Sequence, residues 1–183
     1  MSFSVRPTTS ADLAFVLATE RHPDNACYIT QWSEAQHAAA ISSTDHLHPV
    51  MRSGQNDAHF IAQQAARSVG YCILQGLCDP HRSLLLKRIV IGPKGQGYGR
   101  QLLRWVKQYT FETLGYHRLW LDVLVSNQRA QKLYFSEGFL QEGVMREAYR
   151  TEARQYEDML ILALLEADYV LVTVPVTKGK ASL

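Results

Sequence analysis

Cysteine is scarce in this chain, and long apolar runs are missing. The three cysteines, Cys27, Cys72 and Cys78, are odd in number and lack the spacing of a metal site, which favours reduced thiols over a disulfide framework or a metal centre. The first residues contain no cleavable apolar region, and no segment approaches the roughly 20 apolar residues of a membrane span. We therefore expect a cytoplasmic protein that holds no metal and contacts no membrane.

The chain also lacks a large excess of charge of either sign. A net charge of +2 gives no general argument for nucleic-acid binding, and neither a helix-turn-helix pattern nor an aromatic platform for single strands is present. With 183 residues and 46% hydrophobic composition, the chain can bury one sizeable core. We expect one domain that binds no nucleic acid.

An apolar strand, a glycine-rich turn and an amphipathic helix follow one another in the middle of the chain. Residues Leu84–Ile91 form the strand pattern, Gly92-Pro93 ends it, and apolar residues recur with helical period over Leu102–Leu114. The first N–H groups of such a helix have no intrahelical partners, and its dipole favours negative charge. The turn Lys94–Gly99 therefore predicts a phosphate site.

Two common phosphate motifs do not fit this turn. Gly92 and Gly97 have the spacing of a P-loop, but Tyr98-Gly99 stands where a P-loop has lysine and serine or threonine. A dinucleotide fold needs G-x-G-x-x-G near the start of a βαβ unit, whereas this turn has G-x-G-x-G past mid-chain. On the turn alone, an ordinary tight connection stays open as an alternative.

A second motif follows the predicted strand over residues 116–123. Asn127 can cap a short helix that Gly138 ends. The segment Asn127–Phe139 resembles the pattern Asn-x-x-Ala-x-x-x-Tyr-x-x-x-Gly-Phe of the GCN5-related N-acetyltransferase (GNAT) superfamily. The turn resembles that family's coenzyme A loop, Gln/Arg-x-x-Gly-x-Gly/Ala, with Lys94 in place of Gln or Arg. The resemblance covers Leu84 to Phe139.

This resemblance implies an α/β (α+β) fold: a mixed central sheet of six to seven strands flanked by about four helices. It implies an acetyltransferase domain over residues 1–165 and leaves residues 166–183 as an extension of uncertain structure. The sequence from Gly138 to Glu147, with Tyr156-Glu157-Asp158, looks like the branch of ribosomal-protein-alanine and spermidine N-acetyltransferases. A homodimer is possible by the same resemblance.

Local patterns predict the remaining elements. We expect a first strand at Phe3–Arg6, a helix over Ala11–Thr19 capped by Ser10, and a second helix to Ile41 that starts with a capping box of Ser33 and Gln36. In the first half of the chain we also expect a loop at 45–57 and a hairpin made of strands 59–62 and 69–74. Near the end we expect an antiparallel strand pair at 143–149 and 156–164. Residues 169–174 have strand propensity, and residues 178–183 should be frayed.

The resemblance implies acetyl-CoA as cosubstrate and a primary amine, on a small molecule or a protein N-terminus, as acceptor. Tyr134 is the expected general acid, because a phenol can protonate a departing thiolate; a core aromatic is the alternative. An amide near Ile91 is the expected oxyanion donor. The expected cofactor-binding residues are Ile89, Val90, Ile91, Lys94, Gly95, Gln96, Gly97, Tyr98, Gly99, Arg100, Asn127, Arg129, Ala130 and Tyr134.

The general base is harder to identify from sequence. The strand Leu84–Ile91 holds no carboxylate, so the base must come from elsewhere. Of the polar residues between the first two helices, which line the acceptor side in the family, Glu20 is our candidate; a solvated loop carboxylate is the alternative. Charge along the chain separates a basic stretch at 82–111 from an acidic one at 137–168, which suits a polyphosphate and a cationic amine, respectively. A non-catalytic acyl-CoA-binding domain is the competing hypothesis.

Overall fold

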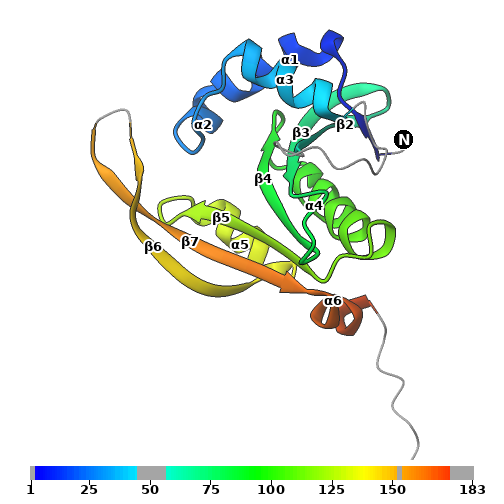
Figure 1. Ribbon diagram of the computed structural model, residues 1–183. Helices are drawn as coiled ribbons and strands as arrows, with labels where there is room; N and C mark the ends of the chain where they lie inside the picture. The colour runs from blue at the N-terminus through cyan, green and yellow to red at the C-terminus, as the bar shows by residue number, and fades with distance from the viewer. Residues whose placement is uncertain (1–2, 45–56, 152–153, 174–183) are drawn as a thin grey trace, which may run out of the picture.

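The computed structural model describes residues 3–44, 57–151 and 154–173, and it is built on a seven-stranded mixed sheet with the order β1-β2-β3-β4-β5-β7-β6 (Figure 1). Nearly all of the loop predicted at 45–57, and the end of the chain from residue 174, lie outside these residues. The strands are β1 Phe3–Pro7, β2 Asp57–Gln64, β3 Arg67–Gln75, β4 Ser83–Ile91, β5 Arg118–Leu124, β6 Leu140–Arg150 and β7 Tyr156–Leu165.

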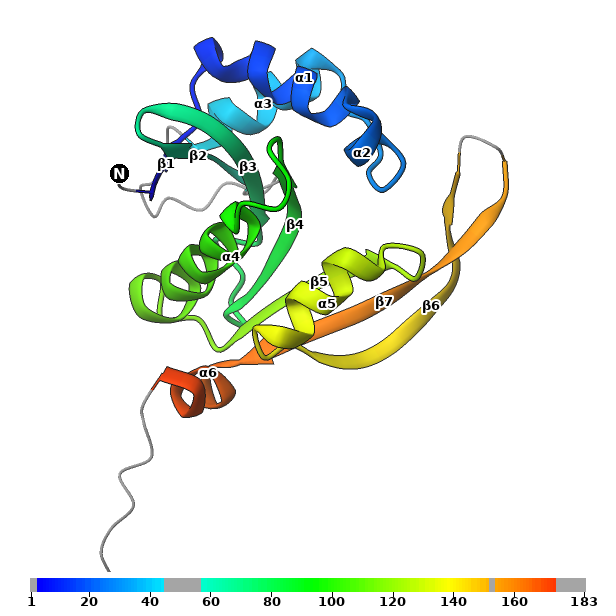
Figure 2. The same cartoon turned by 180° about the vertical axis from the view of Figure 1, so that it is seen from behind.

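Helices cover both faces of the sheet (Figures 1 and 2). One core, which includes Leu102 and Leu103 of α4 and Tyr134 of α5, lies on one face, and a smaller core around Val16 of α1 and Tyr71 of β3 lies on the other. The described α-helices are α1 Leu13–Arg21, α2 Pro23–Ala26, α3 Glu34–Thr44, α4 Tyr98–Gln108, α5 Gln128–Ser136 and α6 Glu166–Thr173, with a 3₁₀ turn at Ser10–Asp12 and a π-helical turn at Tyr109–Thr113.

The one parallel pair of the sheet opens soon after it begins. Strands β4 and β5 pair only from Ser83–Leu85 to Arg118–Trp120 and then separate, as both ribbon views show. On its other edge β4 stays paired with β3, where a register shift leaves Lys87 as the extra residue of a bulge. The sheet therefore divides into two halves with a gap between them.

The bulge also changes which side chains of β4 face which core. Leu84 and Leu86 lie in the core under α4 and α5, but Val90 lies in the core under α1, and Arg88 reaches Glu20 of that helix. Side chains alternate along a strand, so one inserted residue reverses every face that follows. Ile89 and Ile91 consequently point to the α4 side, at the gap.

Several predicted elements are confirmed, including the hairpin, the closing antiparallel pair and the Ser33–Gln36 capping box. The first helical segment begins differently from the prediction. Its N-cap is Thr9 and not Ser10, and the Thr9 amide donates a hydrogen bond to the Asp12 carboxylate. The polar stretch after it also contains a helix: Pro23 occupies the first turn of α2, and the His22 ring accepts a hydrogen bond from the Asp24 amide.

The C-terminal extension is another correction. Residues Glu166–Thr173 form the helix α6, although Tyr169–Val174 has strand propensity. Tyr169 stacks on Phe111 with 4.9 Å between ring centroids, and its hydroxyl donates to Glu112. Packing on the π-helical turn that follows α4 has overridden the local preference, so the start of the extension docks on the domain.

Candidate active site

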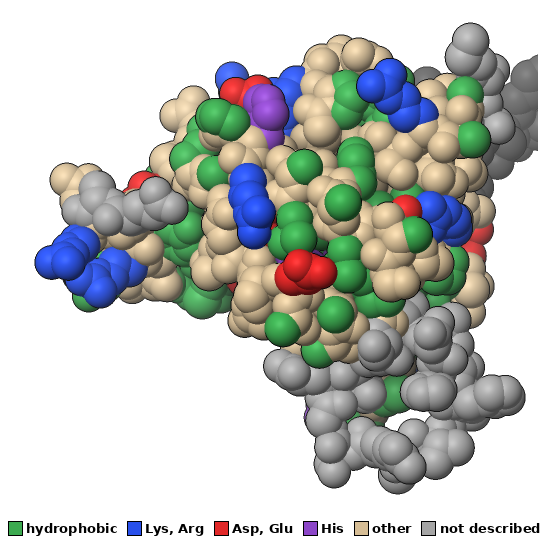
Figure 3. All heavy atoms as spheres, turned by 90° about the horizontal axis from the view of Figure 1, so that it is seen from above, with side chains coloured by type: hydrophobic (Ala, Val, Ile, Leu, Met, Phe, Trp, Pro, Cys, Tyr) green, Lys and Arg blue, Asp and Glu red, His purple; other side chains and the backbone are tan. Residues whose placement is uncertain are grey.

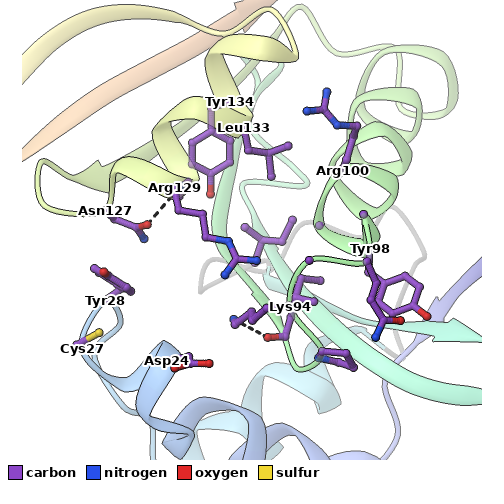
Figure 4. Close-up of a pocket in the computed structure, with 18 of the residues that line it drawn as sticks. Asp24, Cys27, Tyr28, Lys94, Tyr98, Arg100, Asn127, Arg129, Leu133 and Tyr134 are labelled. Atoms are coloured by element: carbon purple, nitrogen blue, oxygen red, sulfur yellow. Dashed lines mark hydrogen bonds between the residues drawn. The ribbon is translucent and has the colours of Figure 1, made fainter.

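A cavity of about 690 Å³ lies at the gap between β4 and β5 (Figure 4). Its walls come from the end of β4, the turn before α4, the first half of α5 and the short helix α2. It collects all of the expected cofactor-binding residues except Val90. The lining is Pro23, Asp24, Cys27, Tyr28, Ile89, Ile91, Pro93, Lys94, Gly95, Gln96, Gly97, Tyr98, Gly99, Arg100, Asn127, Arg129, Ala130, Leu133 and Tyr134.

The turn before α4 leaves the helix N-terminus open to this cavity. Gly95 and Gly97 both adopt φ = +77°, a left-handed conformation that favours glycine. Gly97 is the N-cap of α4, and a Cβ atom built at Gly95 or Gly97 would meet no atom within 4 Å. The N–H groups of the first turn therefore face open space, as the binding of an anion requires.

The edge of β4 presents main-chain groups to the gap. The Gly92 amide donates to the Val69 carbonyl at 2.9 Å, on the β3 side. Neighbouring residues of a strand direct their N–H and C=O groups to opposite edges, so those of Ile91 and Ile89 point to the β5 side, where β5 has separated. Val90 pairs with β3 and is buried under α1, so its expected cofactor contact is not supported.

Tyr134 enters the cavity from α5. Asn127 caps this helix, because its Oδ1 accepts from the Ala130 amide at 3.1 Å. The Tyr134 ring is 6% exposed and packs against Phe139, while its hydroxyl points into the cavity (Figure 4). Burial, with a smaller contribution from the charge of Asp122, raises the pKa of Tyr134. The phenol therefore keeps its proton at neutral pH.

Ion pairs around the buried carboxylate of Glu137 link α4 to the end of α5. Glu137, just after α5, has a side chain that is 3% exposed, and its carboxylate binds Arg100 at 2.7 Å, Arg104 at 3.1 Å and Lys107 at 2.9 Å. Burial alone would raise the pKa of Glu137, but these cations lower it. Three basic residues of the stretch at 82–111 thus hold the tyrosine helix against the helix with the open N-terminus.

The two cations expected at a diphosphate have protein partners in this structure. Lys94 donates to Asn25 Oδ1 and, at 2.7 Å, to the carbonyl oxygen of Ile91. Partial burial, with the nearby charge of Arg129, lowers its pKa. Lys94 therefore links α2 to the end of β4, and Arg100 faces the cavity while bound to Glu137. Backbone amides are the stronger candidates for phosphate contacts.

Glu20 does not lie in a loop and does not line the cavity. It belongs to α1, is 1% exposed, and accepts hydrogen bonds from Arg88 and from the Tyr71 hydroxyl, with His37 Nε2 at 3.2 Å. Burial alone would raise its pKa, but the contacts with His37 and Tyr71 and the charge of Arg88 lower it to about 2. A buried carboxylate with so low a pKa is a poor proton acceptor, which argues against Glu20 as the general base.

Asp122 is a carboxylate near the β4–β5 gap that sequence analysis did not single out, and it is not among the residues that line the cavity. It lies on β5 two residues beyond Trp120, the last residue paired with β4. Leu121 and Val123 are buried in the core under α5, so alternation turns Asp122 to the opposite face. Burial raises its pKa, against the opposing effect of Lys87. Its position in an alternating strand was visible in the sequence, but the opening of the β4–β5 pair was not.

The acidic stretch at 137–168 is largely occupied by internal partners. Glu142 pairs with Arg118, Glu157 Oε2 accepts from Ser126 Oγ at 2.6 Å, and Asp158 Oδ1 accepts from the Glu147 amide at 2.8 Å. The predicted use of this stretch, to attract a cationic amine, is therefore not supported by its contacts.

Two further searches cover the described part of the chain. Three or more His, Cys, Asp or Glu side chains do not come together there as a metal site. None of the helices within the described ranges combines the length and apolar composition needed to cross a membrane. Cys27, Cys72 and Cys78 are all unpaired thiols, and burial raises the pKa of Cys72.

Comparison with known proteins agrees with this geometry. A spermidine N(1)-acetyltransferase from Vibrio cholerae is 30% identical over 117 residues, which are 62% of this chain and 66% of that protein. The Escherichia coli K12 spermidine N(1)-acetyltransferase is 24% identical over 175 residues, 92% of this chain and 89% of that protein. A ribosomal protein bS18-alanine N-acetyltransferase from Salmonella typhimurium is 37% identical over 100 residues, 54% of this chain and 64% of that protein.

The fold also matches solved structures. The Vibrio cholerae spermidine N-acetyltransferase in complex with CoA and spermine superposes with a TM-score of 0.77 at 24% identity, over 92% of this chain and 98% of that one. This likeness confirms the predicted fold, with seven strands and more helices than expected. The sequence pattern of the Acetyltransferase (GNAT) family matches residues 24–139, from α2 to the residue after Gly138. The chain belongs to the GNAT family of acetyltransferases.

Proposed function

We propose that this protein transfers an acetyl group from acetyl-CoA to a primary amine by direct attack within a ternary complex. The observation that carries the proposal is a single cavity that joins the open N-terminus of α4 to the β4–β5 gap and the Tyr134 hydroxyl. A diphosphate and a thioester at the two ends of one elongated ligand need such an arrangement.

Acetyl-CoA would be held mainly by main-chain groups. The amides from Gln96 to Arg100 face the cavity at the start of α4 and suit the diphosphate, with the dipole of the helix behind them. The polar groups of Ile89 and Ile91 on the open edge of β4 suit the amide-bearing arm of the cosubstrate. Bound there, acetyl-CoA supplies an acyl thioester that a neutral amine can attack.

Three groups of the protein then serve the transfer. The Ile91 amide, directed into the gap, stabilises negative charge on the carbonyl oxygen, and such a donor is typically worth about 3 kcal/mol. Asp122 takes a proton from the attacking amine nitrogen as its bond to the acyl carbon forms. Tyr134 gives its proton to the sulfur as the carbon–sulfur bond breaks. Asp122 replaces Glu20 as our proposed base.

Electrostatics favour this division of roles. Burial raises the pKa of Asp122, which makes it a better proton acceptor than an exposed carboxylate. The charge of Asp122 also contributes, after burial, to the raised pKa of Tyr134. The acid and the base therefore approach the reacting centre from α5 and from β5.

The test measures thiol release with acetyl-CoA and a panel of amines. We expect Tyr134→Phe to lower kcat at least tenfold, about 1.4 kcal/mol or more, with the Kd for acetyl-CoA unchanged. Asp122→Asn should remove the limb of the rate profile that rises with pH, whereas Glu157→Gln, at a carboxylate bound to Ser126, should keep it. Binding of acetyl-CoA without turnover on any amine would favour the non-catalytic acyl-CoA-binding alternative.

A further inference from the structure

A second cavity, of about 430 Å³, lies between the end of α2 and the tip of the β6–β7 hairpin. The two elements face each other across an opening in both ribbon views. One wall is Ala26, Ile29, Thr30 and Gln31, and the other is Tyr149, Arg150, Thr151 and Arg154.

The two cavities share the chain segment that runs through α2. Asp24, Cys27 and Tyr28 line the cosubstrate cavity, and the intervening and following residues Ala26 and Ile29 line the second one. The segment is anchored, because Arg88 Nη2 donates to the Thr30 carbonyl at 2.7 Å. An acceptor whose amine enters the β4–β5 gap on this side can therefore extend its remaining atoms into the second cavity.

The described lining of the second cavity is basic. Arg150 and Arg154 line it, and none of its described lining residues is acidic. Throughout the described ranges neither guanidinium is ion-paired with a carboxylate. Figure 3 shows basic side chains gathered at the hairpin tip, at the left of the view. Thr30, Gln31 and Thr151 add hydrogen-bonding side chains.

Three of the described carboxylates that could attract a polycation have other partners, and a fourth, Asp24, lines the cosubstrate cavity and not the second one. Glu20 is buried against Arg88, Glu157 accepts from Ser126, and Asp158 accepts from the Glu147 amide. Arg150 and Arg154, whose guanidinium groups pair with no carboxylate of the described residues, by contrast match the geometry of a carboxylate ligand. We propose that the acceptor is an amine that also carries a carboxylate group, which Arg150 and Arg154 bind. This inference rests on the proposed acetyl transfer and narrows its substrate class.

The experiment compares four acceptors in the thiol-release assay. They are two C-terminally amidated tetrapeptides with free N-termini, Ala-Ala-Glu-Glu and Ala-Ala-Lys-Lys, the free amino acid glutamate, and spermidine. We expect kcat/KM to be at least tenfold higher for the acidic peptide or for glutamate than for the basic peptide and spermidine. Preference for the acidic peptide would indicate a peptide acceptor, and preference for glutamate would indicate a small-molecule acceptor.

Variants then test the two arginines. Arg150→Gln/Arg154→Gln should lower kcat/KM for the preferred acidic acceptor at least tenfold, mainly through KM, and leave the KM for acetyl-CoA unchanged. Arg150→Glu/Arg154→Glu should shift the preference toward the basic peptide. Arg146→Gln is the matched control, because Arg146 is exposed on the same hairpin and lines neither cavity.

Calorimetric titration of the acidic peptide into the CoA-saturated protein distinguishes a failure of the proposed carboxylate site from a failure of the proposed acetyl transfer. Binding that weakens in Arg150→Gln/Arg154→Gln, without turnover of any amine, would support the anionic ligand while rejecting the proposed reaction. Turnover that favours spermidine or the basic peptide, and that is unaffected by both arginine variants, would overturn the inference and leave acetyl transfer standing.

Discussion

Replacing Arg88 by methionine removes the cation from a buried network that anchors the chain segment after α2. Arg88 is 7% exposed and binds the Glu20 carboxylate and the Thr30 carbonyl, with its guanidinium 4.6 Å from the centre of the Trp32 ring. Methionine keeps much of the apolar stem but leaves the Glu20 carboxylate buried without its cation. A stranded buried charge of this kind typically destabilises a protein by about 3–5 kcal/mol.

The pKa of Glu20 gives a second route to the magnitude. Its contacts lower that pKa to about 2 in the folded state, against 4.5 for a free glutamate. The difference corresponds to about 3 kcal/mol of stability at neutral pH, of which Arg88 supplies a part. Because the folded pKa is depressed, this stability is present above about pH 4.5 and is lost as the pH falls toward 2.

Urea unfolding at pH 7 and at pH 4.5 measures the effect. At pH 7 we expect Arg88→Met to lower the free energy of unfolding by about 3 kcal/mol or more. The deficit should shrink at pH 4.5, because Glu20 without its cation has a higher pKa and takes up a proton. Arg88→Met/Glu20→Gln should recover part of the loss at pH 7.

The matched control is Arg67→Met, at an exposed arginine on β3, for which we expect a change within about 0.5 kcal/mol. If Arg88→Met and this control unfold at the same urea concentration, the reasoning about the buried pair is refuted. Acetyl transfer provides an independent readout, since the loop at Thr30 loses its anchor in Arg88→Met and kcat/KM should fall further than the folded fraction does.

Two further predictions concern the sheet. A Cβ atom at Gly70 would lie 2.6 Å from the Val90 carbonyl oxygen. In thermal unfolding, Gly70→Ala should therefore destabilise the fold by about 1–3 kcal/mol, and it should lower kcat by displacing the end of β4. The control Gly143→Ala, where the nearest atom to the new Cβ is at 4.0 Å, should change little. Burial and the charge of His37 lower the pKa of His59 to about 3, whereas the unfolded chain has a histidine of pKa 6.5. The free energy of unfolding should therefore decrease as the pH falls from 6.5 toward 3. If His59→Gln shows the same dependence of this free energy on pH, the assignment to His59 is wrong.

Local sequence was sufficient to predict the parts of the site that depend on short-range chemistry. The glycine turn, the Asn127 cap and the left-handed Gly138 each follow from backbone rules that act over a few residues. Tyr134 is positioned by such a segment, and its hydroxyl points into the cavity. Its catalytic role stays a prediction.

Features that depend on distant partners were not predictable in this way. Glu20 looked like a loop carboxylate because its partner Arg88 is 68 residues away. Lys94 looked like a phosphate ligand because nothing local indicated Asn25 and Ile91 as its acceptors. The acidic stretch looked like an attractive surface until its arginine, serine and backbone partners were seen. A homodimer and a cytoplasmic location stay predictions as well.

Calorimetric titration of acetyl-CoA into Gly99→Asp tests the central claim most directly. Gly99 has ordinary room for a Cβ, with neighbours at 3.6 Å, so the fold should be kept while a carboxylate enters the proposed diphosphate site. Gln101→Asp adds the same charge at an exposed position in the same helix, outside the cavity. We expect Gly99→Asp to bind acetyl-CoA at least tenfold more weakly than the wild type, a loss of about 1.4 kcal/mol or more, and Gln101→Asp to bind it within about threefold of the wild type. Equal affinity in Gly99→Asp and the wild type would contradict the claim that the N-terminus of α4 holds the cosubstrate.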